Sequence, residues 1–455
     1  MAELVRRPLI SVAVLASVAG VACARQAGGE STPAASAAAP AAESALGNPD
    51  DAGSWSERRR LTGDWGGART NLENKGLKFD LGWTQTVQGV VDGGRRRDWD
   101  YGTSFEMVLA TDMQKLVGVP GGFGKIRVEG RTGESVNDDS GVILPTSTDG
   151  FFPLTTPGNE SILTVTELNY AQFLSEQFGL VFGKLQTLDG DPNEFASGRG
   201  RSQFMNFNFI ANGVASRTIP YSAIGGGVVW LPAKSLMISS LIMTTVDSST
   251  TSGFEHLDDG WTWTTELNYQ YKAGNLPGGF NVGAIYAFNG DFANLTDKLS
   301  LVRGEGIETP TDESTWAVYT SFWQYVYSPD AAPEKIDLQN GTMDMRGVGV
   351  FGRLGIADHE TNPIEWSVSG GVAARGMFFG RENDTLGFGY SYSGISDTRR
   401  FVDLALEDGT QALELFYNVA ITPAMGLTFD IQWLDGALTP IDEATVVGAR
   451  FDVRF

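Results

Sequence analysis

The sequence predicts an all-β protein, a transmembrane antiparallel β-barrel of about 16 strands with long outer loops and short periplasmic turns. Three observations support this fold class. Many segments alternate strictly between apolar and polar residues, their lengths suit a tilted strand that crosses a bilayer, and long connections alternate with short ones along the chain. Alternation with a period of two places one face of a strand in an apolar medium and the other in water.

The alternation is clearest in the last segment of the chain, residues 445–455, where the charges lie on one face only. The apolar face has Val447, Ala449, Phe451, Val453 and Phe455, and the other face has Gly448, Arg450, Asp452 and Arg454. The same period recurs at 425–433, 413–421, 261–271 and 79–87, with Trp or Tyr near several ends, as in the aromatic girdles of membrane barrels. A soluble sandwich could show this pattern once, but its repetition favours a barrel.

The N-terminus, residues 1–24, is typical of a secretory signal peptide. A positively charged start precedes an apolar run that ends in the small-residue cleavage site Ala22-Cys23-Ala24. The run is short for a membrane anchor, and Gly20 disfavours the alternative of a lipoprotein acylated on Cys23. Cleavage would remove the only cysteine of the chain, so the mature protein is neither a disulfide scaffold nor a thiol enzyme.

Three segments follow the predicted cleavage site. Residues 25–60 are rich in Ala, Pro and Ser and predict a flexible lead in the periplasm. Residues 61–76 (LTGDWGGARTNLENKG) predict a short periplasmic helix, in which Asp64 caps the start and Gly76 closes the end. Residues 77–455 make up the predicted outer-membrane β-barrel.

Sixteen candidate strands follow from residue 77 onward, and an even number brings both ends of a single-chain barrel to the periplasm. They are 77–92, 99–114, 124–134, 163–175, 180–187, 224–232, 236–247, 261–273, 279–290, 314–327, 345–356, 364–376, 384–396, 412–421, 425–434 and 445–455. Outer connections such as 135–162, 188–223 and 291–313 are then long, and most inner turns are short. One inner connection, 328–344, is longer than the pattern predicts, and its role stays open.

The charge of the chain restricts its partners. The formal net charge is −22 at pH 7, which argues against nucleic-acid binding because that requires a basic face. Acidic outer loops could hold divalent cations that bridge to anionic lipid of the outer membrane. The alternative is that the charge serves solubility alone.

The longest connection, 188–223, is predicted to fold into the lumen and narrow it, because a barrel of this size would otherwise enclose a wide aqueous channel. The alternative is an outer lid over neighbouring loops. The loop carries charged, amide and aromatic side chains that could replace water around a sugar and stack on its apolar face. These candidates include Phe195, Arg199, Arg201 and Phe204.

Several segments resemble the carbohydrate-selective porins of the OprB family. The first is the run from Leu61 to Thr70, and further matches are Phe351, Arg353, Gly355, Asp358, Asn362-Pro363, Gly370-Gly371, Gly380-Arg381, Asp384, Glu414, Tyr417 and Ile421-Thr422-Pro423 with the terminal strand. The resemblance covers about residues 60 to 455 and implies a sixteen-stranded outer-membrane barrel, a narrowed pore and diffusion of sugars down a gradient. It favours a monomer, with a trimer as the alternative.

Alternation predicts which wall residues point into the lumen. The inward set includes Asp80, Glu106, Lys125, Arg127, Glu129, Glu167, Glu266, Arg353, Glu414 and Asp430. Arg127 and Arg353 could present planar donor forks to paired hydroxyls, and carboxylates could accept hydrogen bonds from others. We therefore select Arg127, Glu129, Glu167, Glu266, Arg353 and Asp430 as pore-lining candidates, with a solvated wall residue as the alternative for each.

An enzyme is not expected, because His256 and His359 are the only histidines and both fall in predicted outer loops. No cofactor or structural metal is expected. The pairs Asp138-Asp139 and Asp258-Asp259 could bind calcium through oxygen ligands, but a solvated acidic pair is the favoured interpretation.

Together, the pattern and the resemblance predict a porin in the outer membrane of a Gram-negative bacterium that lets small carbohydrates diffuse passively into the periplasm through a constricted pore. A general or cation-preferring porin on the same barrel is the main alternative, and the acidic composition would suit it. A hydrophobic-solute channel is disfavoured because the N-terminal lead is too polar to fill a lumen. A secreted lectin or glycosidase is disfavoured because exposed apolar strand faces would aggregate in water.

Overall fold

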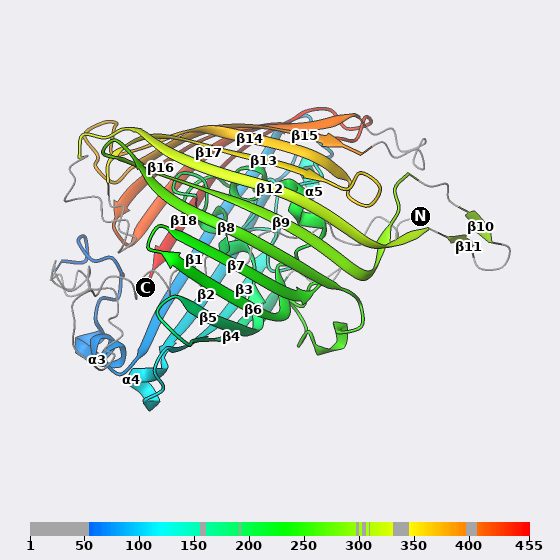
Figure 1. Cartoon of the computed structure of the whole chain (residues 1–455). Helices are drawn as coiled ribbons and strands as arrows, with labels where there is room; N and C mark the ends of the chain where they lie inside the picture. Colours follow the sequence, from blue (N-terminus) through cyan, green and yellow to red (C-terminus); the bar gives the residue numbers. More distant parts are fainter. Residues whose placement is uncertain are drawn as a thin grey trace.

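The computed structural model describes residues 54–154, 161–190, 193–296, 300–302, 306–308, 310–330, 345–396 and 407–455. Its sixteen long strands form one closed barrel in the order β1-β18-β17-β16-β15-β14-β13-β12-β9-β8-β7-β6-β5-β4-β3-β2 (Figure 1). Each strand pairs antiparallel with its neighbours along the chain, and β1 closes the barrel against β18. The predicted fold class is confirmed. The predicted signal peptide and residues 25–53 of the lead lie outside the described residues.

The observed strands agree with the predicted ones to within three residues at every end. They are β1 Leu77–Asp92, β2 Trp99–Asp112, β3 Gly122–Gly133, β4 Ile162–Phe173, β5 Phe178–Gln186, β6 Ser222–Ala233, β7 Leu236–Thr244, β8 Trp261–Ala273, β9 Leu276–Ala293, β12 Thr311–Tyr327, β13 Gly347–Ala357, β14 Ile364–Arg375, β15 Thr385–Ile395, β16 Gly409–Thr422, β17 Met425–Asp435 and β18 Ala444–Arg454. The agreement follows from the period-two pattern, because an error of one residue in register would turn each apolar side chain toward water.

A second, two-stranded sheet was not predicted. It consists of β10 (Ser300–Val302) and β11 (Gly306–Glu308), within the connection that was expected to be a loop between β9 and β12. The hairpin extends beyond the end of the barrel wall (Figure 1). Three-residue strands are too short to show a reliable alternation, which explains why the sequence did not reveal them.

Connection lengths define the two ends of the barrel. At the end where β1 begins and β18 finishes, several turns are very short, such as 234–235, 274–275 and 423–424. The opposite end carries the long connections 134–161 and 187–221. The long inner connection 328–346 remains an exception, and residues 331–344 of it lie outside the described part of the chain.

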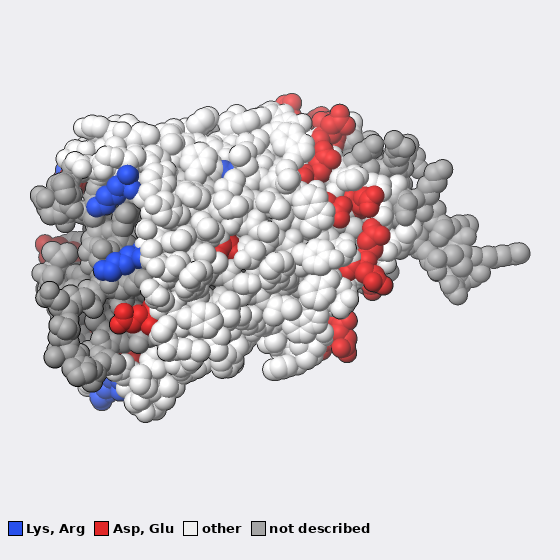
Figure 2. Space-filling view, in the orientation of Figure 1, with Lys and Arg blue, Asp and Glu red and all other residues white. Residues whose placement is uncertain are grey.

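The outer wall has a broad surface with very few charges. In Figure 2 this band lies between an end that carries both basic and acidic side chains and an opposite end lined by Asp and Glu. Large apolar side chains are exposed on it, including Trp263 at 44%, Phe322 at 41% and Leu354 at 51%. Such a surface suits a hydrocarbon environment. Among the described residues, no helix is both long and apolar enough to cross a membrane.

The motif at 61–76, which precedes β1, makes contact with the last residues of the chain at the end of β18. It contains a 3-10 turn, Trp65–Gly67, and the helix α3, Ala68–Asn74. A carboxylate oxygen of Asp64 accepts hydrogen bonds from the backbone N–H and the hydroxyl of Thr70, at 2.7 and 2.8 Å. Gly76 follows the helix with φ of 93°, a conformation that favours glycine.

Arg69 makes the contact with the closing strand. Its guanidinium is buried, lies 4.3 Å from the ring centroid of Trp65, and donates a hydrogen bond of 3.0 Å to the backbone oxygen of Phe455. The backbone N–H of Leu61 donates to the carbonyl of Arg454 at 2.8 Å. The motif therefore covers the β1–β18 seam at its periplasmic end.

We predict that Arg69→Ala lowers the stability of the barrel by about 1–3 kcal/mol, because it removes a charge-assisted hydrogen bond and a cation–π contact at the seam. The measurement is the temperature at which the folded band shifts on a gel after heating in detergent. Lys75→Ala, at an exposed position after the same helix, is the matched control. Equal transition temperatures for Arg69→Ala and wild type would contradict the prediction.

Candidate functional site

The connection between β5 and β6, residues 187–221, lies inside the barrel. It contains the 3-10 turns Leu188–Gly190, Gly198–Gly200 and Gly213–Arg217 and the short helix α6, Phe207–Ile210. It contacts inward side chains and backbone carbonyls of strands far away in the sequence. The amide of Asn193 donates to Ser321 and to the carbonyl of Phe322, and the amide of Asn212 donates to the carbonyl of Leu354.

Buried charged side chains of the wall hold the backbone of this loop. Arg353 donates to the carbonyls of Phe209 at 2.6 Å, Ala196 at 2.7 Å and Ile210 at 3.2 Å. Arg450 donates to the carbonyls of Gly200 and Gln203, and the carboxylate of Glu414 accepts from the N–H groups of Met205 and Asn206 at 2.6 and 2.9 Å. A loop enclosed in a lumen needs such partners, because an unpaired buried backbone group costs about 1–3 kcal/mol.

Aromatic side chains anchor the loop at two places. The ring of Phe195 packs against Tyr325, with centroids 4.7 Å apart, and the ring of Phe204 packs against Phe416 at 4.8 Å. Glycines in the wall make room for them. A Cβ atom at Gly349 would lie 2.0 Å from the Phe195 ring, so any larger residue there would displace the ring.

The structure corrects the expected role of these two phenylalanines. Phe195 is 5% exposed and Phe204 is not exposed, so neither ring offers a face to a solute. Their bulk is better accommodated against the glycine-lined wall than in the aqueous lumen. Glycines at alternate positions of β13 and β15 were the sequence signal for this packing.

Three wall candidates also differ from their expected role. Arg353 is 2% exposed and donates three hydrogen bonds to carbonyls of the loop. Glu266 is 2% exposed and accepts from the hydroxyl of Tyr319, and Asp430 is 6% exposed and accepts from Gln432. They do point inward, but the folded loop and neighbouring side chains cover them, which alternation alone does not predict.

The other five candidates come together in one charged network. Arg127 and Glu129 lie on β3, Glu167 lies on β4, and Arg199 and Arg201 lie on the loop. Nε of Arg127 donates to Glu167 at 3.1 Å, and Arg199 donates to Glu129. Each acidic member has at least one basic partner, so the buried charges are compensated.

Sequence reasoning missed several members of this network as site residues. Asp189 pairs with Arg127 and with Arg199, and Asp149 pairs with Arg201. The hydroxyl of Tyr221 donates to Glu129 at 2.7 Å. All three lie in outer loops, where no strand period indicates the direction of a side chain.

A strained turn presents the two loop arginines. Arg199 has φ of 59°, between Gly198 at 82° and Gly200 at 75°. The left-handed conformation costs a non-glycine residue about 1–2 kcal/mol, so its ion pairs with the wall must hold it in place. The G-R-G-R run was the available sequence signal.

Four side chains form the accessible side of the network, which we call the exposed edge. The exposed fractions of their side chains are 21% for Glu106, 19% for Asp189, 17% for Arg201 and 16% for Lys125. Arg201 lies 2.8 Å from Glu106, and Lys125 lies 3.7 Å from Asp189. The edge therefore offers donors and acceptors in pairs.

The electrostatic surroundings keep the edge charged. Burial raises the pKa of Asp189, but the charges of Arg127, Arg199 and Lys125 outweigh it and hold that pKa well below its ordinary value. Asp189 is thus ionised at neutral pH. Its side chain is an acceptor only, whereas those of Arg201 and Lys125 are donors only.

The described part of the outer connection between β3 and β4, residues 134–154, packs against the network and the lumenal loop. The ring of Phe152 stacks on Tyr221 with centroids 4.6 Å apart and planes 13° from parallel. The N–H of Thr148 donates to the carbonyl of Met205, and the N–H of Phe207 donates to the carbonyl of Pro145, both at 2.9 Å. Two outer loops are therefore packed together in the lumen.

Comparison with known proteins decides the family. The model of the carbohydrate-selective porins, OprB family, matches residues 96–455. The chain belongs to the OprB family. This confirms the resemblance seen in the sequence, and it makes the protein an outer-membrane transport channel and not an enzyme.

Relatives of this OprB-family chain cover most of its length. Porin B of Pseudomonas aeruginosa is 24% identical over 432 residues, which is 87% of this chain and 91% of that protein. The high-pH structure of Pseudomonas putida OprB has a TM-score of 0.74 at 21% identity, covering 88% of this chain and 100% of that one. The low-pH structure of the same protein has a TM-score of 0.55 at 17% identity, with coverage of 88% and 99%. These structures share the barrel fold.

We predict that Arg353→Ala releases the lumenal loop without unfolding the barrel, because it removes three hydrogen bonds to loop carbonyls, worth about 3 kcal/mol or more together, and leaves the backbone pairing of β13 with β12 and β14 in place. Single-channel recording should show a larger and more unstable conductance. Arg97→Ala, in an exposed ion pair with Asp92, is the control. A steady wild-type conductance in Arg353→Ala would show that the loop does not depend on this residue.

Proposed function

We propose that the protein lets small carbohydrates diffuse passively into the periplasm through a constricted, water-filled pore, and that the exposed edge of the charged network selects them. The observation that carries the proposal is the paired arrangement of Glu106, Lys125, Asp189 and Arg201 beside a loop packed inside the barrel. A sugar has adjacent hydroxyls that donate and accept at once. Paired donors and acceptors match this chemistry better than a ring of one charge does.

The balance of charges in the network supports sugar passage over a general or cation-preferring pore. The basic members are Lys125, Arg127, Arg199 and Arg201, and the acidic members are Glu106, Glu129, Asp149, Glu167 and Asp189. Opposite charges neutralise one another there. On the face seen in Figure 2, most acidic side chains of the surface lie at the outer rim.

Transport also requires weak binding. A net gain of about 1 kcal/mol for each hydrogen bond exchanged with water gives a site that releases its solute readily. The ion pairs behind the exposed edge hold the donors and acceptors in position before the sugar arrives. This lowers the entropic cost of recognition without requiring a deep pocket.

We predict that sugars block the single-channel current of the purified protein in a planar bilayer in a saturable manner, and that Arg201→Gln and Glu106→Gln each weaken the block about three- to tenfold. Each change removes a charged partner that a hydroxyl would contact. Lys75→Gln, in the periplasmic motif, is the control. A current insensitive to mono- and disaccharides, with a strong cation preference under a salt gradient, would favour the alternative porin.

We further propose that exposed carboxylates of the outer rim hold divalent cations that bridge to anionic lipid, and that the mature protein is a monomer lacking residues 1–24. A pore assembled wholly from one chain needs no second copy, although a trimer is the alternative. Native mass spectrometry of protein extracted from membranes should give the mass of one chain from residue 25 onward. A trimer, or a chain that retains residues 1–24, would contradict this part.

A further inference from the structure

Gly82 lies on β1, and its missing side chain leaves open space inside the barrel. Its cross-strand partner on β2 is Glu106 of the exposed edge, so Gly82 belongs to the lumenal face of the wall as well. Apart from its chain neighbours, a Cβ atom at Gly82 would meet no atom within 4 Å. Among the glycines of the sixteen long strands as described, only Gly82 has this property. An opening of the lumen therefore lies beside Glu106.

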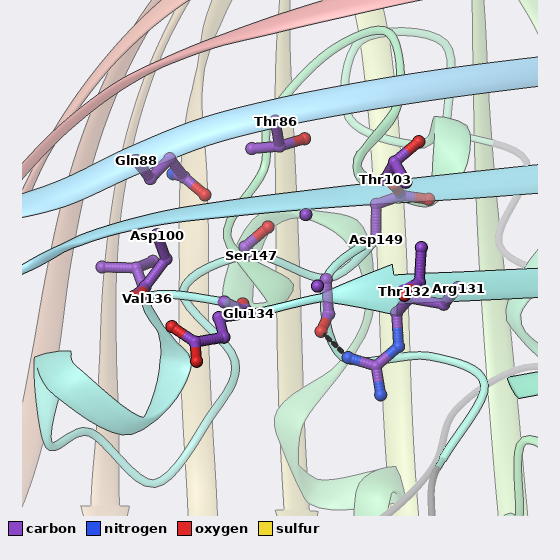
Figure 3. A pocket seen from close by; sticks show the side chains of 14 residues that line it. Thr86, Gln88, Asp100, Thr103, Arg131, Thr132, Glu134, Val136, Ser147 and Asp149 are labelled. Carbon is purple, nitrogen blue, oxygen red and sulfur yellow. Dashed lines mark hydrogen bonds between the residues drawn. The ribbon is translucent and has the colours of Figure 1, made fainter. Parts of the chain in front are cut away.

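Toward the outer end of the barrel, the lumenal face of β1 and β2 is covered. Thr84 is 4% exposed and Ser104 is 3% exposed, and the hydroxyl of Ser104 donates to Asp149 of the connection 134–154 at 2.6 Å. The cavity that remains there has a volume of about 20 Å³, and Figure 3 shows it lined by side chains of the two strands, such as Gln88, and of that connection. This space has room for a water molecule but not for a sugar.

The same connection encloses Asp139, which lies on the short helix α5, Asn137–Ser140. Asp139 is 3% exposed, and its Oδ1 lies 2.8 Å from Nη2 of Arg96 in the connection between β1 and β2. The sequence favoured a solvated acidic pair at Asp138-Asp139, and the burial of Asp139 corrects that interpretation. The outer part of this wall is therefore covered by two connections that contact one another.

Toward the periplasmic end, the same lumenal face becomes accessible. Asp80 lies two residues before Gly82, and 49% of its side chain is exposed. Its cross-strand partner Val108 and the next inward residue of β2, Ala110, are partly exposed as well. Two residues of a strand span about 7 Å, so a solute that leaves Glu106 along this wall meets the carboxylate of Asp80 next.

Arg60 holds this carboxylate from the periplasmic segment that precedes β1. Its Nη2 donates to Oδ1 of Asp80 at 2.9 Å, and its Nη1 lies 3.5 Å from Oε1 of Glu73 on α3. The helix α3 lies at the end of the barrel where β1 begins (Figure 1). Only 11% of the Arg60 side chain is exposed, so Arg60 fixes and compensates the charge while Asp80 stays accessible.

We propose that Asp80, positioned by Arg60, is a second carbohydrate-binding subsite at the inner mouth of the pore, and that solutes reach it from the exposed edge by passing Gly82. We call it the inner subsite. The identity of its ligand rests on the proposed function: a sugar hydroxyl donates to the carboxylate, which is an acceptor only. Weak sites in series let a solute bind and then move on, which conduction requires.

Thiol modification tests the path without any sugar. Cys23 is the only cysteine of the chain, so wild-type protein treated in the same way is the reference for a cysteine placed in the barrel. We expect Gly82→Cys to react with a water-soluble, positively charged methanethiosulfonate reagent and to lose about half of its single-channel current, because the attached group narrows the lumen beside Glu106. Leu81→Cys, on the lipid-facing side of β1, should keep its current. An unchanged current in treated Gly82→Cys would overturn the path.

Sugar block of the single-channel current tests the inner subsite. Asp80→Asn keeps the side-chain shape, and we expect it to weaken the block about three- to tenfold, as should Arg60→Gln. The double variant should lose no more than either single variant, because Arg60 acts through Asp80. Glu382→Gln is the matched control, since it removes an exposed carboxylate from an ion pair with Arg346 at the same end of the barrel.

Gel mobility before and after heating verifies that each variant is folded. Equal block of wild type and Asp80→Asn would overturn the inner subsite and leave the proposed function intact. Equal weakening in Glu382→Gln would overturn it too, because any charge at the barrel end would then act alike. Losses that add in the double variant would overturn the positioning role of Arg60. If no sugar blocks the wild type, the inner subsite is overturned together with the proposed function, and the result for Gly82→Cys still establishes or excludes the path.

Discussion

The structure depends on one constraint: backbone groups of a loop folded into a barrel must find partners away from bulk water. Three charged wall residues meet this need. Arg353 and Arg450 bind carbonyls of the loop, and Glu414 binds two successive N–H groups. Because each replaces several water contacts with charge-assisted hydrogen bonds, the loop has a defined path across the lumen. The position of every functional side chain on the loop follows from that path.

Packing and charge then divide the lumen into two kinds of surface. On the β13–β16 side, glycines accept aromatic rings such as Phe204, and the loop seals against the wall. On the β2–β4 side, the loop faces the wall through arginines and carboxylates, and a polar edge stays accessible. The loop is therefore held by apolar contacts on one side and leaves polar side chains accessible on the other.

Charge is distributed differently on the outer surface and in the lumen. A net charge of −22 lining the pore would favour cation flow, yet on the face seen in Figure 2 most carboxylates lie at the outer rim, and the inner network is nearly balanced. Fixed, compensated charges in a narrow space provide hydrogen bonds without a strong field. Net charge therefore says little about the lumen, and the proposed selectivity rests on the local pairing of charges.

The sequence by itself determined the barrel, its strand boundaries and the loop that enters the lumen, because alternation and connection length are local properties of the chain. It also placed Arg127, Glu129 and Arg353 on the inward face. Only the tertiary structure decided what they contact. A period of two indicates a face, but it does not indicate which part of a distant loop will cover it, so Arg353 became an anchor while Arg127 joined the network. Burial of Asp139 likewise depends on two loops that meet only in the folded protein.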